Sequence, residues 1–160
     1  MADAATTSSN DKLWSLIRQI RVAMLTTETE DGSLRSRPMM TLQADGASLW
    51  FYTSRSAPKG GEIEDHHAVN LSFSDPQSQI YVSVSGRARL VDDRTRIRAL
   101  WNDYAKLFFP QGADDPDLAL LEVMVEGAEY WDSDQAAMRR LEREGPEAVS
   151  PSDLGDNRKL

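Results

Sequence analysis

Closely spaced turn signals divide the first third of the chain into β-rich runs. Glu30-Asp31-Gly32 follows the run Val22 to Thr27, and Ala44-Asp45-Gly46 follows the run Ser33 to Gln43. An acidic residue followed by glycine is typical of the tight turn between neighbouring strands. Two adjacent hairpins make a meander, so this pattern predicts an antiparallel sheet rather than a parallel sheet with helical crossovers.

Four further β-rich runs follow along the chain. They are Leu49 to Ser54, Val69 to Ser74, Ile80 to Leu90 and Leu120 to Trp131. Six strands with few helices predict a small barrel or a sandwich, and closure into a barrel would protect the edges of the sheet. The fold class is therefore mainly β with peripheral helices.

Two short helices are expected, one around Pro58 to Ile63 and one over Gln135 to Glu144. Two further segments have helical periodicity. Leu13, Trp14, Ile17 and Ile20 share one face of a helix near the start of the chain. A second helix begins at Asp92 or Asp93 and carries one apolar stripe. The residues of that stripe are Ile97, Leu100, Trp101, Tyr104 and Phe108. Because such a stripe usually packs against a sheet, these helices are expected on the outside of the barrel.

The length of 160 residues suits one domain with one core. We expect a flexible tail over residues 1–10, a single barrel domain over 11–144 and an extended tail over 145–160. The chain has no cysteine, which excludes disulfides and thiolate metal sites. Its net charge of −8 argues against nucleic-acid binding, and its apolar runs are too short to span a membrane. A cytoplasmic protein is expected.

The segment from Arg35 to Lys59 holds the strongest candidate for a binding site. Arg35 and Arg37 lie two apart on one strand, so they share a face. Hydroxyls, backbone amides and a lysine follow the next hairpin, in Thr53-Ser54-Arg55-Ser56 and at Lys59. Such groups can hold a phosphate. A solvated strand face and a capped turn explain the same residues, and local chemistry leaves both interpretations open.

Several short segments follow one another in a characteristic order along most of the chain, from Trp14 to Trp131. They are Ser36-Arg37-Pro38-Met39-Met40, Leu49 to Ser54, Lys59, Asn70 to Phe73, Tyr81 to Ala88 and Glu129 to Asp132. In this order they resemble the six-stranded antiparallel split β-barrels of the FMN-binding type in the pyridoxamine 5′-phosphate oxidase-like family. Trp101 and the segment Phe109 to Pro116 resemble its bacterial general stress protein branch.

The resemblance implies a flavin site with FMN as the cofactor and FAD as a second candidate. Arg37 and Lys59 would hold the phosphate, with hydroxyl or amide donors from Thr53 and Ser54. The backbone of Pro38, Met39 and Met40 would meet the ring or ribityl edge, and the main chain of Phe51 and Tyr52 would line the pocket. Trp131, Trp101 and Phe108 would close over the flavin from the partner subunit of a homodimer. Each of these aromatic residues has a second interpretation as a core or dimer contact.

The resemblance leaves the activity open between two interpretations. The protein is either a flavin-dependent oxidoreductase of unknown substrate or a non-catalytic flavin-binding module of the stress response. Oxidation of pyridoxamine phosphate is disfavoured, because the stretch Ser133 to Met138 lacks the histidine that the oxidases carry after the closing strand. No side chain stands out as catalytic.

A related barrel that binds deazaflavin or haem is a third interpretation. Only His66 and His67 could provide a histidine ligand to haem iron. Adjacent histidines diverge by about 100° on a helix and do not chelate one metal easily, so no metal site is expected.

Overall fold

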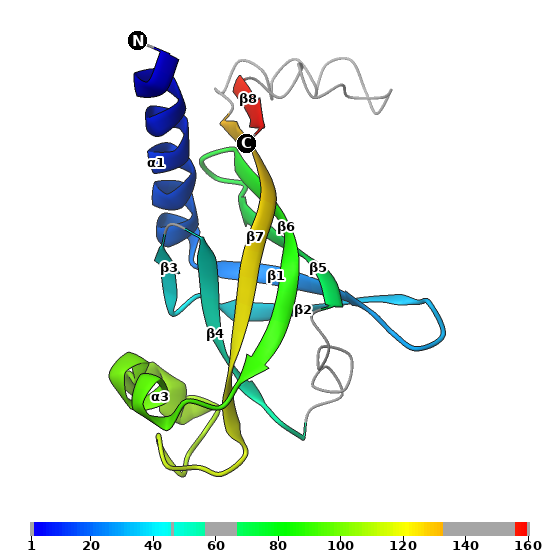
Figure 1. Ribbon diagram of the computed structural model, residues 1–160, viewed down its shortest axis with the longest axis vertical. Helices are drawn as coiled ribbons and strands as arrows, with labels where there is room; N and C mark the ends of the chain where they lie inside the picture. The colour runs from blue at the N-terminus through cyan, green and yellow to red at the C-terminus, as the bar shows by residue number, and fades with distance from the viewer. Residues whose placement is uncertain (1, 46, 57–66, 133–155, 160) are drawn as a thin grey trace.

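The computed structural model describes residues 2–45, 47–56, 67–132 and 156–159. Its strands form one curled antiparallel sheet with the order β2-β1-β5-β6-β7-β4-β3, and β8 pairs with β7 (Figure 1). The elements in chain order are α1 (Ala2–Ile20), β1 (Val22–Glu28), β2 (Leu34–Met40), β3 (Gln43–Asp45), β4 (Ser48–Ser54), β5 (His67–Asp75), β6 (Ile80–Val91), α3 (Arg94–Leu100), the 3₁₀ helix η1 (Asp103–Leu107), β7 (Leu118–Asp132) and β8 (Asp156–Lys159). The predicted mainly β split-barrel class is confirmed.

The number of strands differs from the six that the sequence predicted. The run expected over Ser33 to Gln43 is divided into β2 and β3, because its middle residues change partner strands. The Thr41 amide donates to the Arg21 carbonyl oxygen beside β1, whereas the next amide, of Leu42, donates to Trp50 in β4. The other additional strand is β8, in the segment expected to be an extended tail.

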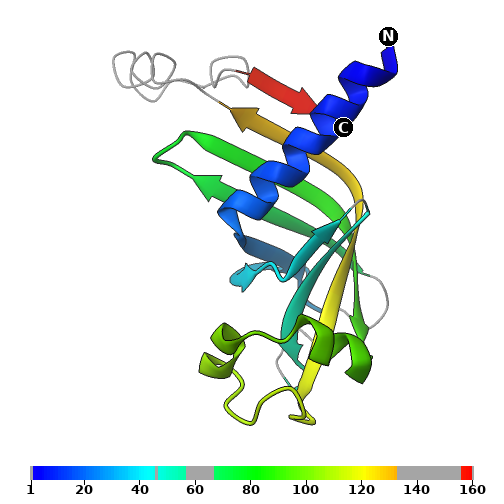
Figure 2. The same ribbon diagram turned by 90° about the vertical axis from the view of Figure 1, so that its left-hand side faces the viewer.

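The main core lies between α1 and the concave side of the sheet. Leu13, Leu16 and Ile17 of α1 are buried against residues such as Phe51 and Phe73. Figures 1 and 2 show this helix at one end of the curled sheet. The helix starts at Ala2, so residues 2–10, where the sequence suggested a flexible tail, are helical.

A smaller core lies at the opposite end, where α3 and η1 cover β4 and β7 (Figure 2). The single helix expected here is divided in two, because the chain is extended at Trp101 and Asn102. The Asn102 side chain accepts a hydrogen bond of 3.1 Å from the Ala105 amide and so starts a new helix. As a result, Tyr104 and Phe108 leave the predicted apolar stripe and are exposed.

Two other expectations fall on residues outside the described ranges. They are the short helix around Pro58 to Ile63, which includes Lys59, and the helix over Gln135 to Glu144. Within the described part of the chain, no helix is long and apolar enough to cross a membrane.

Candidate functional site

A pocket of about 380 Å³ lies between β2 and β4, under η1 and the turn that follows it. β2 and β3 stand at the two ends of the hydrogen-bonded strand order, so the pocket occupies the seam of the curled sheet. Its lining residues are Val22, Pro38, Met39, Met40, Leu42, Tyr52, Thr53, Ser54, Asn102, Tyr104, Ala105, Phe108 and Phe109. The seam thus brings together two of the segments that the sequence assigned to one site.

The register of the first hairpin determines which side chains of β2 face the core and which project from the opposite face. Arg37 and Met39 lie opposite Leu25 and Ala23, whose side chains face the core. Pro38 and Met40 therefore project from the opposite face of the strand. Because β2 pairs on one side only, with β1, the missing amide of Pro38 breaks no ladder. Proline within a sheet is confined to an edge strand or a bulge, and the regular register identifies an edge strand here.

The β4 wall is held in place by Tyr52. Its hydroxyl donates a hydrogen bond of 2.7 Å to the Ile97 carbonyl oxygen at α3. Its ring contacts the rings of Trp101 and Phe109, with centroid separations of 5.7 and 6.4 Å. Burial raises the pKa of Tyr52 to about 12, so the phenol stays neutral at physiological pH. The tyrosine therefore contributes an apolar, uncharged surface.

Thr53 contributes a polar group that lacks a partner. Its side chain is 2% exposed, and its hydroxyl makes no hydrogen bond within the described ranges. A buried hydroxyl without a partner costs about 1–3 kcal/mol. Thr41 has the same unpartnered, buried hydroxyl but does not line the pocket. The Thr53 hydroxyl therefore has the capacity to gain a hydrogen bond, and a ligand in the pocket that this residue lines is one candidate partner.

Ser54 lines the pocket at the end of β4, where its hydroxyl already has a partner. It donates to the carboxylate of Asp117, which lies in the loop before β7. That bond, together with bonds from the amide and hydroxyl of Ser56, holds the pKa of Asp117 below its ordinary value of 3.8. The carboxylate is therefore ionised at neutral pH beside the predicted phosphate-binding segment. Asp117 was not among the predicted site residues, because only the fold brings it to Ser54.

Arg37 does not line the pocket. It lies on the core-facing side of β2, half-buried, and its Nη1 donates a hydrogen bond of 2.6 Å to the Thr27 hydroxyl on β1. Lys59 is outside the described ranges. The predicted pair of phosphate-binding cations thus stays a prediction.

The aromatic residues expected at the site are dispersed. Phe108 lines the pocket and is 70% exposed, whereas Trp101 contacts only its wall through Tyr52. Phe51 is buried in the main core. Trp131 lies 13 residues beyond Leu118 on β7, which is about 43 Å of extended strand from the end next to Ser54. Trp131 does not line this pocket in the single chain.

Six lining residues were not among the predicted site residues: Val22, Leu42, Asn102, Tyr104, Ala105 and Phe109. Val22 could have been found from strand alternation, because it shares a face with Met24, and both are exposed. The η1 residues could not, because the sequence indicated one continuous helix. No group of three or more His, Asp or Glu side chains that could hold a metal occurs within the described ranges.

Comparison with known proteins shows the family of this chain. Residues 8–143 match the model of the family described as pyridoxamine 5′-phosphate oxidase like. General stress protein 26 of Bacillus subtilis is 28% identical over 115 residues, which cover 70% of this chain and 80% of that protein. Protein bli-3 of Neurospora crassa is 28% identical over 129 residues, 74% of this chain but only 62% of bli-3.

A solved structure supports the same assignment. The general stress FMN/FAD binding protein of Xanthomonas citri superposes with a TM-score of 0.68 and is 29% identical. The superposition covers 78% of this chain and 89% of that one. The family model matches more than half of the chain, including the strands on both sides of the seam. The chain belongs to the pyridoxamine 5′-phosphate oxidase-like family.

Proposed function

We propose that this protein is an FMN-binding flavoprotein of the general stress type, which works as a homodimer with the flavin at the subunit interface. One observation carries the proposal. The pocket at the seam gathers Pro38 to Met40 and Tyr52 to Ser54, and it includes the buried, unpartnered hydroxyl of Thr53. The family resemblance independently assigns both of these segments to the flavin.

The chemistry of the pocket suits an isoalloxazine ring. Its volume of about 380 Å³ falls within the range usual for cofactor sites. Met40, Leu42 and Phe108 offer thioether, aliphatic and aromatic surface, which packs well on a flat and largely apolar ring. Thr53 and Ser54 supply polar groups at one end. FAD is a second candidate, if its adenylate extends out of the seam.

The named relatives support the proposal. The Xanthomonas citri protein is described as binding FMN or FAD, and the Bacillus subtilis relative is named as a general stress protein. Each of them matches more than two thirds of this chain.

Exposed apolar side chains in and beside the pocket support the homodimer. Val22 and Met24 on β1 and Phe108 after η1 are large apolar side chains left in water. Contiguous surfaces of this kind commonly mark interfaces. A second chain would cover them, and it could bring a distant aromatic residue such as Trp131 over the pocket.

The described lining residues include no acidic, basic or histidine side chain. A bound flavin would supply hydride-transfer chemistry. The chain would position the ring and exclude water, and the neutral Tyr52 would not act as a base. Two activities are therefore proposed: an oxidoreductase of unknown substrate, in which the flavin would supply the chemistry, and a non-catalytic flavin-binding module as the alternative. Anaerobic reduction of the bound flavin by NADH or NADPH, followed by turnover with an acceptor, distinguishes them.

Titration with FMN, followed by flavin absorbance and fluorescence, tests the proposal. We expect wild-type protein to bind FMN and the pocket-filling variant Met40→Trp to lose binding. Leu34→Trp is the matched control, because Leu34 lies on the same face of β2, is exposed and does not line the pocket. Equal FMN binding by both variants, or none by the wild type, would refute the proposal. A spectrum with haem or deazaflavin bands in the purified protein would favour those ligands instead.

A further inference from the structure

The short segment after β4 is fastened to one residue of a distant loop. Asp117 accepts hydrogen bonds at its carboxylate from the Ser54 hydroxyl and from the amide and hydroxyl of Ser56, the last two at 3.0 Å. Its carbonyl oxygen accepts a further bond of 2.9 Å from the Arg55 amide. Every residue from Ser54 to Ser56 is therefore bonded to Asp117, although 61 or more positions separate them in sequence.

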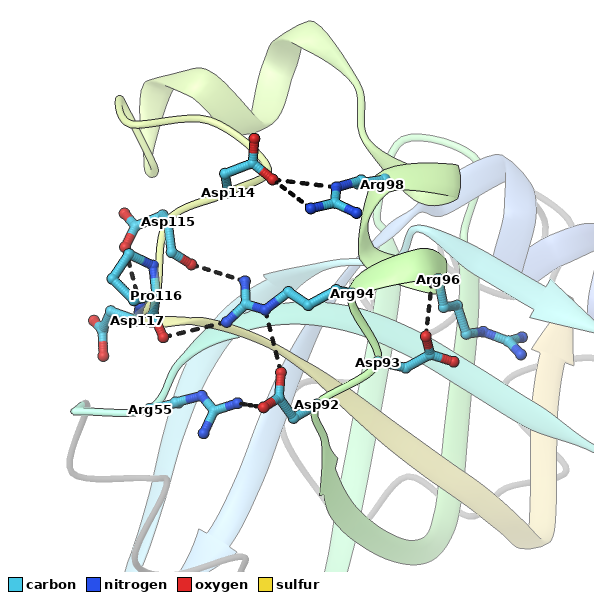
Figure 3. Close-up of polar contacts among 10 residues, drawn as sticks. All are labelled: Arg55, Asp92, Asp93, Arg94, Arg96, Arg98, Asp114, Asp115, Pro116 and Asp117. Atoms are coloured by element: carbon cyan, nitrogen blue, oxygen red, sulfur yellow. Dashed lines mark hydrogen bonds and ion pairs between the residues drawn. The ribbon is translucent and has the colours of Figure 1, made fainter.

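Asp117 is itself held rigidly by its neighbours (Figure 3). Its amide donates a bond of 2.9 Å to the Asp115 carboxylate. Arg94 on α3 donates to the carbonyl oxygens of Asp115 and Pro116, at 2.9 and 3.3 Å. The loop before β7 is thus fixed to α3, and the Ser54 to Ser56 segment is fixed to that loop.

An ion pair strengthens the same connection from the other side. Arg55 pairs with Asp92, which also pairs with Arg94 at 3.3 Å (Figure 3). The Arg55 guanidinium holds the pKa of Asp92 below its ordinary value. Both carboxylates therefore stay ionised at neutral pH, and the network persists under the conditions in which a ligand binds.

These bonds decide which groups of the segment can meet an anion. A hydroxyl has one proton to donate. The hydroxyls of Ser54 and Ser56 both donate theirs to the carboxylate of Asp117. The amides of Arg55 and Ser56 are bonded to Asp117 as well. An oxyanion bound at this end of the pocket must therefore be held by the donors that remain, such as the further N–H groups of the Arg55 guanidinium, and the backbone conformation of residues 54–56 decides where they point. Asp117 sets that conformation.

We propose that Asp117 is a positioning residue for the phosphate end of the flavin site, acting through the Ser54 to Ser56 segment and not by touching the ligand. This inference rests on the proposed function. It assigns a role to Asp117, which directly follows the segment Phe109 to Pro116 that resembles the general stress branch. Discrimination between FMN and riboflavin, which lacks the phosphate, is the property that Asp117 controls.

The test compares the dissociation constants of FMN and riboflavin for wild type and Asp117→Ala. We expect the variant to bind FMN about tenfold to a hundredfold more weakly, from the loss of three hydrogen bonds. Riboflavin affinity should change by less than about twofold, since the ring surface is unaltered. Asp117→Asn, which keeps an oxygen acceptor, should recover part of the preference and covers the case in which Asp117→Ala does not fold.

Asp114→Ala is the matched control. Asp114 lies in the same loop and pairs with Arg98, with contacts of 2.8 and 3.1 Å, but the described bonds of its side chain do not reach Ser54 to Ser56. We expect this variant to keep the wild-type preference for FMN. An equal loss of FMN and riboflavin affinity in the Asp117 variants, or an unchanged ratio, would overturn the inference while leaving the flavin pocket intact. A wild type that binds neither flavin would overturn the proposed function itself.

Discussion

Thr53 combines two properties that rarely occur together in a folded protein. It is buried, and its hydroxyl has no hydrogen-bond partner within the described ranges. Most buried polar side chains have a partner, so an exception calls for an explanation. A ligand that supplies the missing bond is the explanation favoured by its place in the pocket lining.

Replacing Thr53 by valine, which has the same shape, separates folding from binding. We expect Thr53→Val to raise the stability of the ligand-free protein by about 1 kcal/mol, because an unpaired hydroxyl is removed. FMN affinity should fall about fivefold to tenfold, because the bond to the ligand is lost. Urea denaturation and FMN titration measure the two effects.

Thr41→Val is the control for that substitution. Thr41 is equally unpartnered but lies outside the pocket lining, so its valine variant should gain stability and keep its FMN affinity. Unchanged FMN affinity in Thr53→Val would show that the hydroxyl does not meet the ligand.

Tyr52 provides a prediction at alkaline pH. Its pKa in the folded protein is raised to about 12, whereas an exposed tyrosine ionises near its ordinary value of 10.0. The unfolded chain therefore loses its proton first. Stability contributed by the neutral phenol is complete below about pH 10 and is lost as the pH rises toward about 12.

The tyrosinate absorbance of the folded protein measures this ionisation. We expect a late step near pH 12 in the wild type that is missing in Tyr52→Phe. The phenylalanine variant should also lose stability less steeply above about pH 10. If the absorbance titrations of the two proteins differ only near pH 10, that result would contradict the burial of Tyr52 and its bond to Ile97.

At the scale of the elements, regular alternation and turn chemistry were sufficient to predict most of the sheet. Val22 to Thr27, Leu49 to Ser54 and Leu120 to Trp131 agree closely with β1, β4 and β7. The predicted element boundaries are wrong where the hydrogen-bonding partners of the backbone change within a few residues. Thr41 and Leu42 bond to different parts of the sheet, and Asn102 restarts a helix, so neither break follows from periodicity alone.

The long pairing of β6 with β7 depends on Gly86. The register shifts between Ser85 and Gly86, and a Cβ at Gly86 would lie 2.2 Å from the carbonyl oxygen of Met124. Backbone on the facing strand cannot move aside cheaply. We therefore expect Gly86→Ala to destabilise the protein by about 1–3 kcal/mol or more, as measured by urea denaturation. Ser85→Ala, at an exposed neighbouring position, should change stability by less than about 0.5 kcal/mol. Similar stabilities for both variants would contradict the close approach.

At the scale of the whole molecule, the sequence could indicate the β2 and β4 walls of the candidate site but not its remaining parts. Strand residues such as Met40 and Tyr52 come together because the sheet curls until its ends meet. Asp117 reaches Ser54 across the start of β7, which no local pattern reveals. Trp131 is a different case, because its predicted role requires a second chain.

The size of the molecule in solution tests the proposed homodimer. We expect light scattering to give twice the chain mass of 17.9 kDa for the wild type. Met24→Lys places a charge on the exposed apolar face of β1, outside the pocket lining, and should favour the monomer and weaken FMN binding. Gln77→Lys, in the exposed turn between β5 and β6, is the control and should remain dimeric. A monomeric wild type with full FMN affinity would contradict the dimer.

A crystal structure of the protein grown with excess FMN shows whether flavin binds at the seam. We predict flavin density there, with the ring between Met40 and Tyr52, a hydrogen bond to the Thr53 hydroxyl and the phosphate beside Ser54 to Ser56. Flavin bound elsewhere, or a seam without density at saturating FMN, would contradict it.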